Sequence, residues 1–388
     1  MRICAIGLRG IPDVMGGIET HCEQLYPRLA DLDGDLDITV IGRSGYAQSG
    51  RLGNVRLVSV WAPKRKALET LVHTPLALIY ARLFLHPHMV HLHAIGPGFF
   101  APLARLLGFR VLATHHATDY DRPKWGRFGK LFLKVGERMI ARFANDVICV
   151  SGTIEAGLAA EYPKRREHYV TIRNGAPPQQ AQSQAQRQDI LARLGVEAGK
   201  YMLAVGRLDA VKGFHDLIGA FAKAAPKDMK LVIAGGGQEG DAYVEGLRRM
   251  ASRDVIFAGT LPAADVRALF AKTALFVHPS YMEGFAMVVL EAIAADAPML
   301  ITGIAPNREL NLDEANYFQA GDVDGLARRL SAGNFDQLRC ARRTEIMAEA
   351  DWDRIAERHH AIIVKRPSLT PAERRRRAEA AGISPRPN

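Results

Sequence analysis

Two glutamates, Glu283 and Glu291, stand in the stretch EGFAMVVLE, which is otherwise apolar. Carboxylates are rarely buried unless they are paired or hydrogen-bonded. The stretch follows a strand-like segment, TALFVHPSYM, and continues into a helical pattern. This pattern places Glu283 in a loop and Glu291 in the following helix, where both could accept hydrogen bonds from the hydroxyls of a ligand.

Two cations, Arg207 and Lys212, flank the end of another strand-like segment in AVGRLDAVKGF. A helical pattern begins directly afterwards, near Phe214. Arginine can hold phosphate oxygens with two N–H groups, and lysine acts as a point charge. The pair suits a diphosphate, although two solvated surface cations would give the same sequence.

Adjacent glycines, Gly16 and Gly17, precede a helical pattern in GLRGIPDVMGGIET. Glycines at such a junction let backbone N–H groups approach a phosphate at the positive end of a helix. The spacing is not G-x-G-x-x-G, so the dinucleotide fingerprint is absent. A turn needed only for packing is the alternative interpretation.

A histidine pair, His115 and His116, ends the strand-like segment of LATHHATDYDRPKWGRF. The pair could have either a structural or a functional role, and the sequence favours neither. Polar and aromatic side chains follow it closely: Asp119, Arg122, Lys124 and Trp125.

Short β-branched segments alternate with longer helical patterns along the chain. The predicted strands are RICAIG, DITVIG, VRLVSV, MVHLHAI, RVLATHH, DVICVS and YVTIRN, then YMLAVGR, KLVIAGG, DVIFAGT, ALFVHPS and PMLIT. Repeated β-α-β units predict parallel, doubly wound sheets with right-handed crossovers. The fold class is therefore α/β, with two Rossmann-like domains facing across a cleft and ligands beyond the carboxyl ends of the strands.

The domain boundaries follow from composition. Residues 1–178 form the predicted N-terminal domain, and 179–190 a linker, because APPQQAQSQAQRQ is rich in Pro, Gln and Ser. Residues 191–358 form the second domain, which ends in the helical pattern around Trp352. Residues 359–388 form a basic tail.

The net charge of +10 is unevenly distributed over the 388 residues. Residues 1–180 hold 23 lysines and arginines against 15 acidic residues, and the tail holds 7 against 2. The basic parts suit an anionic partner. Four scattered cysteines form no C-x-x-C pair, which argues against disulfides and zinc and fits a reducing cytosol.

The most apolar stretch, LETLVHTPLALIYARLFL, is interrupted by His73, Pro75 and Arg82. No spanning helix is expected there. The apolar run at the N-terminus, MRICAIGLRGIP, is too short for a signal peptide. We expect a cytoplasmic protein, with a peripheral position at the inner face of the membrane as an additional hypothesis.

The helical pattern after RPKW carries cations and apolar residues at helical spacing. The cations are Lys124, Arg127, Lys130, Lys134, Arg138 and Arg142, and the apolar residues are Phe128, Leu131, Phe132, Val135, Met139 and Phe143. A basic amphipathic helix of this kind suits anionic headgroups or the pyrophosphate of an acceptor. A solvated face over an ordinary core contact is equally open.

In combination, GGIE, VGRLDAVKG and EGFAMVVLEAIA resemble the retaining GT-B glycosyltransferases of the family 4 type. The stretches RGIPDVMGGIET, HLHAIGPG and DYDRPKWGRF are similar to a bacterial subgroup of rhamnosyl and polysaccharide-assembly transferases. The resemblance covers most of the chain. It implies transfer of a hexosyl or deoxyhexosyl unit from a nucleotide-diphosphate sugar to a lipid-linked or oligosaccharide acceptor in cell-surface polysaccharide assembly.

The same resemblance implies roles for individual residues. Arg207 and Lys212 would hold the donor diphosphate, Glu283 the hydroxyls of the transferred sugar and Glu291 the ribose. His116 aligns best with the active-site histidine, and His115 stays open. The backbone amides of Gly284, Phe285 and Ala286 would add to the phosphate site. Gly16 and Gly17 would let the first domain close against donor and acceptor. The candidates on the acceptor side are Asp119, Arg122, Lys124 and Trp125.

The resemblance implies no metal and no cofactor beyond the nucleotide sugar as co-substrate. The Asp-rich DLDGDLD is more typical of a polar turn than of a metal site. A nucleotide-sugar epimerase or phosphorylase on the same frame is one alternative, and a non-catalytic nucleotide-sugar or nucleic-acid binding protein is another. Nucleic acid is not expected as a partner, since aromatic content is 7% and no RNA-binding motif occurs. The sequence leaves GDP-mannose, UDP-sugars and dTDP-rhamnose open as donors.

Overall fold

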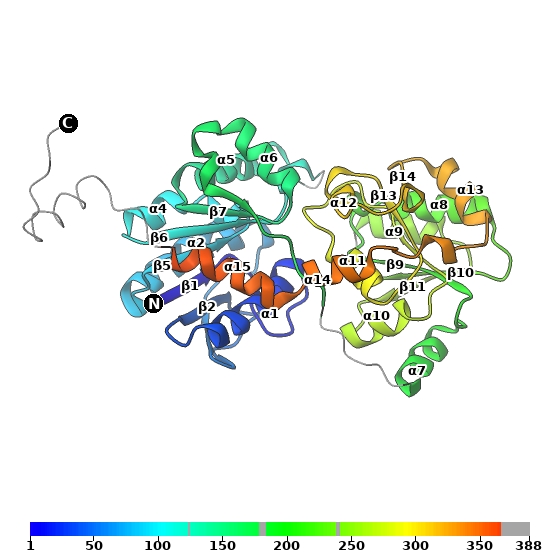
Figure 1. Cartoon of the computed structure of the whole chain (residues 1–388), viewed down its shortest axis with the longest axis horizontal. Coiled ribbons are helices and arrows are strands. Elements are labelled where there is room, and N and C mark those ends of the chain that lie inside the picture. The colour runs from blue at the N-terminus through cyan, green and yellow to red at the C-terminus, as the bar shows by residue number, and fades with distance from the viewer. Residues whose placement is uncertain (123–124, 178–183, 238–240, 366–388) are drawn as a thin grey trace, which may run out of the picture.

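The computed structural model describes residues 1–122, 125–177, 184–237 and 241–365. Two lobes lie side by side, each a twisted sheet between layers of helices (Figure 1). The predicted fold class, two Rossmann-like α/β domains, is confirmed.

The sheet of the first lobe has eight strands in the order β3-β4-β2-β1-β5-β6-β7-β8. All pairs are parallel except the edge hairpin of β3 with β4. The bounds are β1 (Arg2–Ile6), β2 (Asp37–Arg43), β3 (Gly50–Leu52), β4 (Val55–Val60), β5 (Met89–His93), β6 (Arg110–His115), β7 (Asp146–Cys149) and β8 (Tyr169–Thr171). Runs of Val, Ile and Leu suit such strands because helices cover both faces of the sheet.

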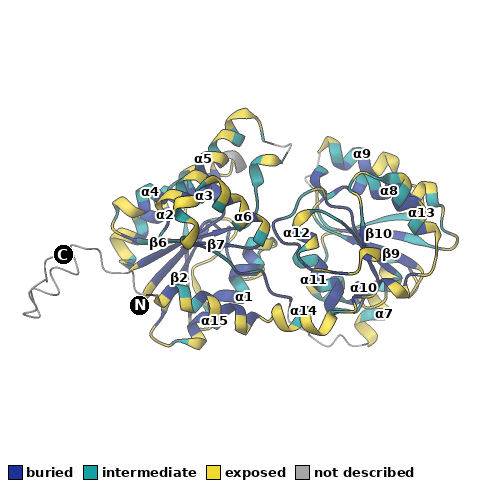
Figure 2. Ribbon diagram, turned by 45° about the horizontal axis from the view of Figure 1, so that its top comes forward, coloured by how far each residue is buried: buried dark blue, intermediate teal, exposed yellow. Residues whose placement is uncertain are grey.

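The helices of the first lobe lie on the two faces of its sheet. They are α1 (Gly17–Leu32), α2 (Lys66–Tyr80) with the π-helical turn η1 (Ala81–Leu85), α3 (Ile95–Gly98), α4 (Ala101–Leu106), α5 (Arg127–Phe143) and α6 (Gly152–Glu161). Alternate residues of β1 point to opposite cores, Ile3 and Ala5 to the side of α1, and Cys4 and Ile6 to the side of α2. The central strands are accordingly buried, and exposure is concentrated on the outer helices, the loops and the edge strand β3 (Figure 2).

The second lobe has six parallel strands in the order β11-β10-β9-β12-β13-β14. They are β9 (Tyr201–Val205), β10 (Lys230–Ala234), β11 (Val255–Gly259), β12 (Leu275–His278), β13 (Met299–Thr302) and β14 (Tyr317–Phe318). The helices are α7 (Gln184–Leu194), α8 (Phe214–Ala224), α9 (Ala242–Met250), α10 (Ala263–Phe270), α11 (Met287–Ala294), α12 (Ala305–Arg308), α13 (Val323–Ser331) and α14 (Arg343–Glu349).

The last helix, α15 (Trp352–Val364), returns to the first lobe and packs against α1 (Figure 1). Its apolar residues, including Trp352 and Ile355, share a core with α1 and the first sheet. The predicted boundary at residue 358 is therefore wrong, because it divides a helix whose buried face belongs to the N-terminal lobe. Likewise α7 begins at Gln184, inside the segment predicted as a linker, and the tail beyond residue 365 lies outside the described residues.

The chain thus crosses between the lobes twice, and the two crossing segments touch. Ala176 donates its N–H to the carbonyl of Ala350 at 2.8 Å. Gly175 lies so close to the indole of Trp352 that a Cβ at this glycine would approach the ring to 2.6 Å. The outgoing and returning segments are held together at one place.

Candidate functional site

Glu283 lies in the loop between β12 and α11, where two groups bind its carboxylate. Lys212 donates to Oε1 from Nζ at 2.5 Å, and Nε2 of His278 lies 2.9 Å from the same oxygen. Burial by itself would raise the pKa of this carboxyl, but Lys212 and His278 bring it well below its usual range. Glu283 is therefore an ionised carboxylate that is held in place from two sides.

Glu291 is in a different state. It lies in the second turn of α11, and burial raises its pKa to about 7, with the charge of Arg267 opposing the rise. The two glutamates of the opening stretch therefore carry different charges near neutral pH. They do not act as an equivalent pair.

Arginines from both lobes converge at the predicted diphosphate site. Arg122 of the first lobe lies 2.7 Å from Asp119 and 3.7 Å from Asp209, and Arg207 of the second lobe lies 3.8 Å from Asp209. Partial desolvation lowers the pKa of Arg207, whose side chain is 57% exposed. The charges of Arg122 and Arg9 lower this pKa further, whereas Asp209 and Asp119 oppose the shift. An anion bound beside Arg207 would offset the repulsion that this guanidinium experiences from Arg122 and Arg9.

Arg9 was not predicted from the sequence. Its backbone N–H and its Nε both donate to Glu19 Oε1 at 3.0 Å, and it also donates to the carbonyl of Met15. These bonds fix its guanidinium beside Gly16. His278, the last residue of β12, and Asp209, which follows β9, were not predicted either. Their position near the end of a strand is the only sequence signal for them.

Two close approaches bring the lobes together around these groups. A Cβ on Gly17 would lie 3.7 Å from Cε of Met287, at the start of α11. A Cβ on Gly284 would overlap the carbonyl oxygen of His116, so only glycine fits there. The predicted glycines of the first lobe thus face the predicted helix start of the second.

The histidine pair divides into two roles. His115 is fully buried, and its Nε2 lies 2.7 Å from Glu137 of α5. His116 is half-buried, lies against Gly284, and has Nε2 at 3.1 Å from Nδ1 of His93. The placement favours His116 as the histidine of the site and gives His115 a structural partner.

The remaining predicted site residues differ in which of their groups a ligand could reach. Phe285 and Ala286 are buried in the core, so only their backbone groups are available to a ligand. Trp125 is half-buried and packs against Gly129 and the core of the first lobe. Lys124 lies outside the described residues.

A further contact between the lobes had no signal in the sequence. Glu309, at the end of α12, accepts hydrogen bonds from the backbone N–H groups of Gly152 (2.9 Å) and Thr153 (2.7 Å) at the start of α6. A carboxylate is stabilised at a helix N-terminus. The second lobe therefore supplies part of the cap of a helix in the first.

Comparisons with known proteins show which families the two lobes match. Residues 15–180 match the model of Glycosyltransferase Family 4, and residues 186–334 match that of Glycosyl transferases group 1. A glycogen synthase of Mycobacterium tuberculosis is 27% identical over 285 residues, which are 70% of this chain and 67% of that protein.

Solved structures show the same fold. Sucrose-phosphate synthase from Thermosynechococcus elongatus has a TM-score of 0.76 at 20% identity, over 98% of this chain and 99% of that one. HepE from Anabaena, solved in complex with UDP-glucose, has a TM-score of 0.72 at 18% identity, over 94% and 99%.

Proposed function

Because the chain belongs to the glycosyltransferases, with each lobe matching a family of that class, we propose that it is a retaining, metal-independent hexosyl- or deoxyhexosyltransferase. The donor is a nucleotide-diphosphate sugar, and the acceptor is lipid-linked or an oligosaccharide in cell-surface polysaccharide assembly. The observation that carries the proposal is that Arg122 of the first lobe and Arg207 of the second both lie near Asp209, in the segment whose Lys212 binds Glu283.

Transfer breaks the bond between the anomeric carbon and the diphosphate, and negative charge develops on the departing phosphate oxygen. Arg207, Lys212 and the backbone N–H groups at the start of α11 would stabilise that charge as fixed positive groups. Glu283 would accept hydrogen bonds from the transferred sugar, and the departing phosphate would take the proton of the acceptor hydroxyl. The acceptor then attacks from the face on which the phosphate leaves, which gives retention.

The donor is proposed from the relatives. HepE was solved with UDP-glucose, and this supports a UDP-hexose as the first donor to test. The motifs of the first lobe that resemble rhamnosyl transferases make a dTDP-deoxyhexose the second, and GDP-mannose the third.

Acceptor-dependent release of the nucleoside diphosphate tests the proposal. A thermal-shift screen over nucleotide sugars first selects the donor, because a ligand that binds only the folded state raises the Tm. Release that requires both donor and acceptor supports a transferase. Conversion of the donor without acceptor indicates an epimerase, conversion that requires added orthophosphate indicates a phosphorylase, and binding without any turnover indicates a binding protein.

Donor affinity should depend on pH through Glu291. An ionised carboxylate accepts ribose hydroxyl bonds more strongly than the neutral acid, and the pKa of Glu291 is about 7. The Kd should therefore weaken by up to about tenfold as pH falls from about 8 to about 6. Calorimetry with an intact nucleotide sugar measures it, since its phosphate diesters do not titrate in this range.

The matched variant is Glu291→Gln, which should bind the donor more weakly at every pH and without this dependence. A wild-type Kd that stays constant over the range would remove Glu291 from the donor site.

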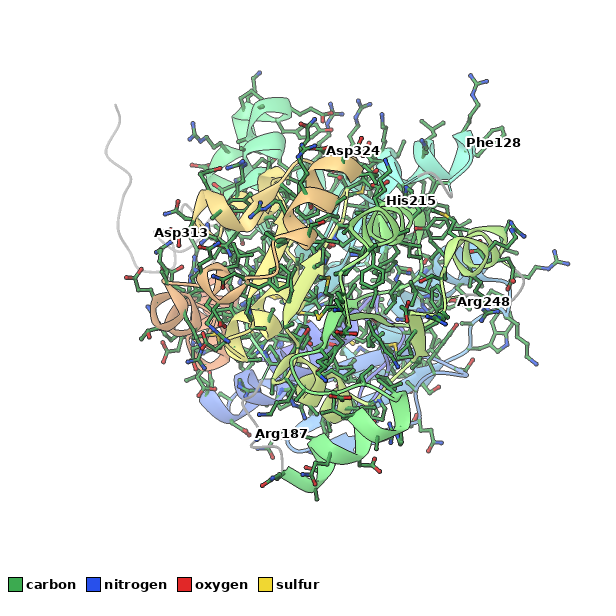
Figure 3. The ribbon with its side chains drawn as sticks, turned by 90° about the vertical axis from the view of Figure 1, so that its right-hand side faces the viewer. Phe128, Arg187, His215, Arg248, Asp313 and Asp324 are labelled. Carbon is green, nitrogen blue, oxygen red and sulfur yellow. The ribbon has the colours of Figure 1, made fainter. Side chains whose placement is uncertain are left out.

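A second part of the proposal concerns an apolar and basic face of the first lobe. Phe128 and Leu131 of α5 are 89% and 60% exposed, so part of the apolar stripe predicted for this helix lies outside the core (Figure 3). The cations Arg127, Lys134 and Arg138 on the same helix are also exposed. Only the inner side of α5, including Leu133 and Ile140, packs on the lobe.

A second apolar surface of the same lobe lies on α2 and η1, where α2, like α5, packs against α3. The outer side of α2 and η1 is apolar, with Leu68, Leu71, Leu76, Ile79, Leu83 and Phe84 all exposed. The stretch Leu68–Leu85 is long and apolar enough to cross a membrane by length and composition, and 33% of it is buried inside the lobe. His73 and Leu78 pack fully into the lobe, which favours a helix that lies along a membrane surface over one that spans it.

Liposome sedimentation should therefore show binding that rises with anionic lipid and falls with salt. The double variant Leu83→Ser and Phe84→Ser should weaken it by roughly 30-fold or more, since two large apolar side chains each contribute about 1 kcal/mol or more when they leave water. Met250→Ser is the control, because Met250 is a comparably exposed apolar residue of the second lobe. Binding that is indifferent to anionic lipid and salt, or equal losses in both variants, would contradict this interface.

A further inference from the structure

Behind His116 lies a buried row of polar side chains that the proposed chemistry does not use. It comprises Thr114, His91, Tyr26 and His93, all with no solvent exposure. The row begins inside the first sheet and ends at His116, where the lobes meet. Buried polar groups in a core require partners, and here each finds its partner in the next member of the row.

The distances define a continuous hydrogen-bonded chain. Nε2 of His91 lies 2.7 Å from Oγ1 of Thr114, and its Nδ1 lies 2.9 Å from the hydroxyl oxygen of Tyr26. The same hydroxyl oxygen lies 2.5 Å from Nε2 of His93. Nδ1 of His93 then lies 3.1 Å from Nε2 of His116.

The histidines in this chain are neutral. Burial places the pKa of His116 well below its usual range, and the neighbouring His21 and His93 lower it further. A neutral imidazole has one N–H, which sits on either Nδ1 or Nε2. The neighbours of each ring decide which nitrogen carries it.

Tyr26 has a single hydroxyl proton, so it donates to one of its two histidines and accepts from the other. The chain consequently has only two polarities. A hydroxyl that donates makes a shorter bond than an N–H that donates. The 2.5 Å contact to His93 is therefore the bond in which Tyr26 donates, and the 2.9 Å contact to His91 is the bond in which it accepts.

The remaining bonds agree with this polarity. Since His91 donates from Nδ1, its Nε2 accepts, and the hydroxyl of Thr114 donates to it at 2.7 Å. Since Nε2 of His93 accepts, its Nδ1 carries the proton and donates to Nε2 of His116 at 3.1 Å. His116 is left with its proton on Nδ1, a nitrogen that makes no hydrogen bond to another described residue.

We propose that Tyr26 and His93 are positioning residues, which with His91 and Thr114 hold His116 as the Nδ1–H tautomer, so that it presents a neutral N–H donor to the ligand between the lobes. The ligand group would be an oxygen of the donor sugar or its diphosphate. This assignment rests on the proposed function only for the identity of that ligand, because the tautomer is a property of the free protein.

Nitrogen NMR of the full-length protein with nitrogen-15-labelled histidine tests the assignment without any substrate. The signals of His116 are identified by their loss in His116→Gln. We expect the proton on Nδ1 in the wild type and a shift toward Nε2 in Tyr26→Phe. With substrate, Tyr26→Phe should lower kcat by about tenfold or more with a smaller change in KM, because in the other tautomer Nδ1 of His116 becomes an acceptor and no longer donates to charge that develops on the ligand.

Two further comparisons separate positioning from mere folding. Tyr201→Phe also removes a buried hydroxyl, one that donates to the carbonyl of Leu269 at 2.6 Å in the second lobe, and it should leave the tautomer unchanged. Thr114→Val should shift the tautomer in the same direction as Tyr26→Phe, and Thr114→Ser should restore it. The Thr114 pair decides the question if Tyr26→Phe does not fold.

A proton on Nε2 of His116 in the wild type would overturn the proposal. So would a tautomer that is unchanged in both Tyr26→Phe and Thr114→Val. A shift of the tautomer in a protein that turns over no nucleotide sugar would uphold the assignment while refuting the transferase function.

Discussion

Lys212→Met should lower kcat for sugar transfer by roughly 100- to 1,000-fold, the usual cost of removing one preorganised group that stabilises developing negative charge. Lys212 is the cation bound directly to Glu283, and methionine keeps most of its length and apolar stem while removing the charge. The charge is needed most when the diphosphate departs, so kcat should fall more than donor affinity. Steady-state kinetics over donor concentration, at saturating acceptor, measures both.

The control is Lys223→Met. Lys223 is a lysine of α8 in the same lobe that pairs with Asp324 at 2.6 Å on the surface. It should retain wild-type kinetics, because exposed ion pairs contribute little. A folded Lys212→Met protein with near-normal kcat would show that the diphosphate does not bind at this lysine.

Glu283→Gln should lower kcat by about 10- to 100-fold and change the KM for the donor by much less. The substitution keeps the shape of the side chain but removes the charge that Lys212 and His278 hold in place. If Glu283 binds the transferred sugar, its contribution grows as positive charge develops at the anomeric carbon, and binding that strengthens only in the transition state appears in kcat. The same measurements on Glu291→Ala should show the reverse pattern, a raised KM for the donor and a smaller effect on kcat.

The double variant Lys212→Met with Glu283→Gln sharpens this test. The two side chains share an ion pair, so the loss in the double variant should be smaller than the product of the two single losses. If Glu283→Gln and Glu291→Ala both kept normal rate and donor affinity, the two glutamates would have structural roles only.

The strands and the glycine-containing junctions could be predicted because their determinants are local. Val and Ile runs specify buried parallel strands, and the stretch from Glu283 to Glu291 contains its own loop and helix start. The different charges of the two glutamates could not be predicted. They depend on Lys212 and His278 in one case and on burial in the other. His278 is close to Glu283 in the chain, but Lys212 is 71 residues away, and the burial of Glu291 is a product of the tertiary fold.

The contacts between the lobes were hidden for the same reason. Nothing in the sequence indicates a partner for Arg9 or Glu309. Only tertiary packing brings Arg9 near enough for its charge to lower the pKa of Arg207 and places Glu309 at the start of α6. The boundary at residue 358 failed because the amphipathic pattern of α15 shows that the helix has a buried face but not which lobe buries it.

The contact of the two crossing segments restricts how the lobes can move. Ala176 and Ala350 are joined by a backbone hydrogen bond, so sliding or twisting of one lobe past the other would break it, whereas hinge bending would preserve it. Torsion changes in a few residues beside this bond would be enough to rotate a whole lobe. Such a rotation would separate Arg122 from Asp209 and Gly284 from His116 together, so one degree of freedom would make or break the contacts of the site that join the lobes, while the contacts of Glu283 inside the second lobe stay intact.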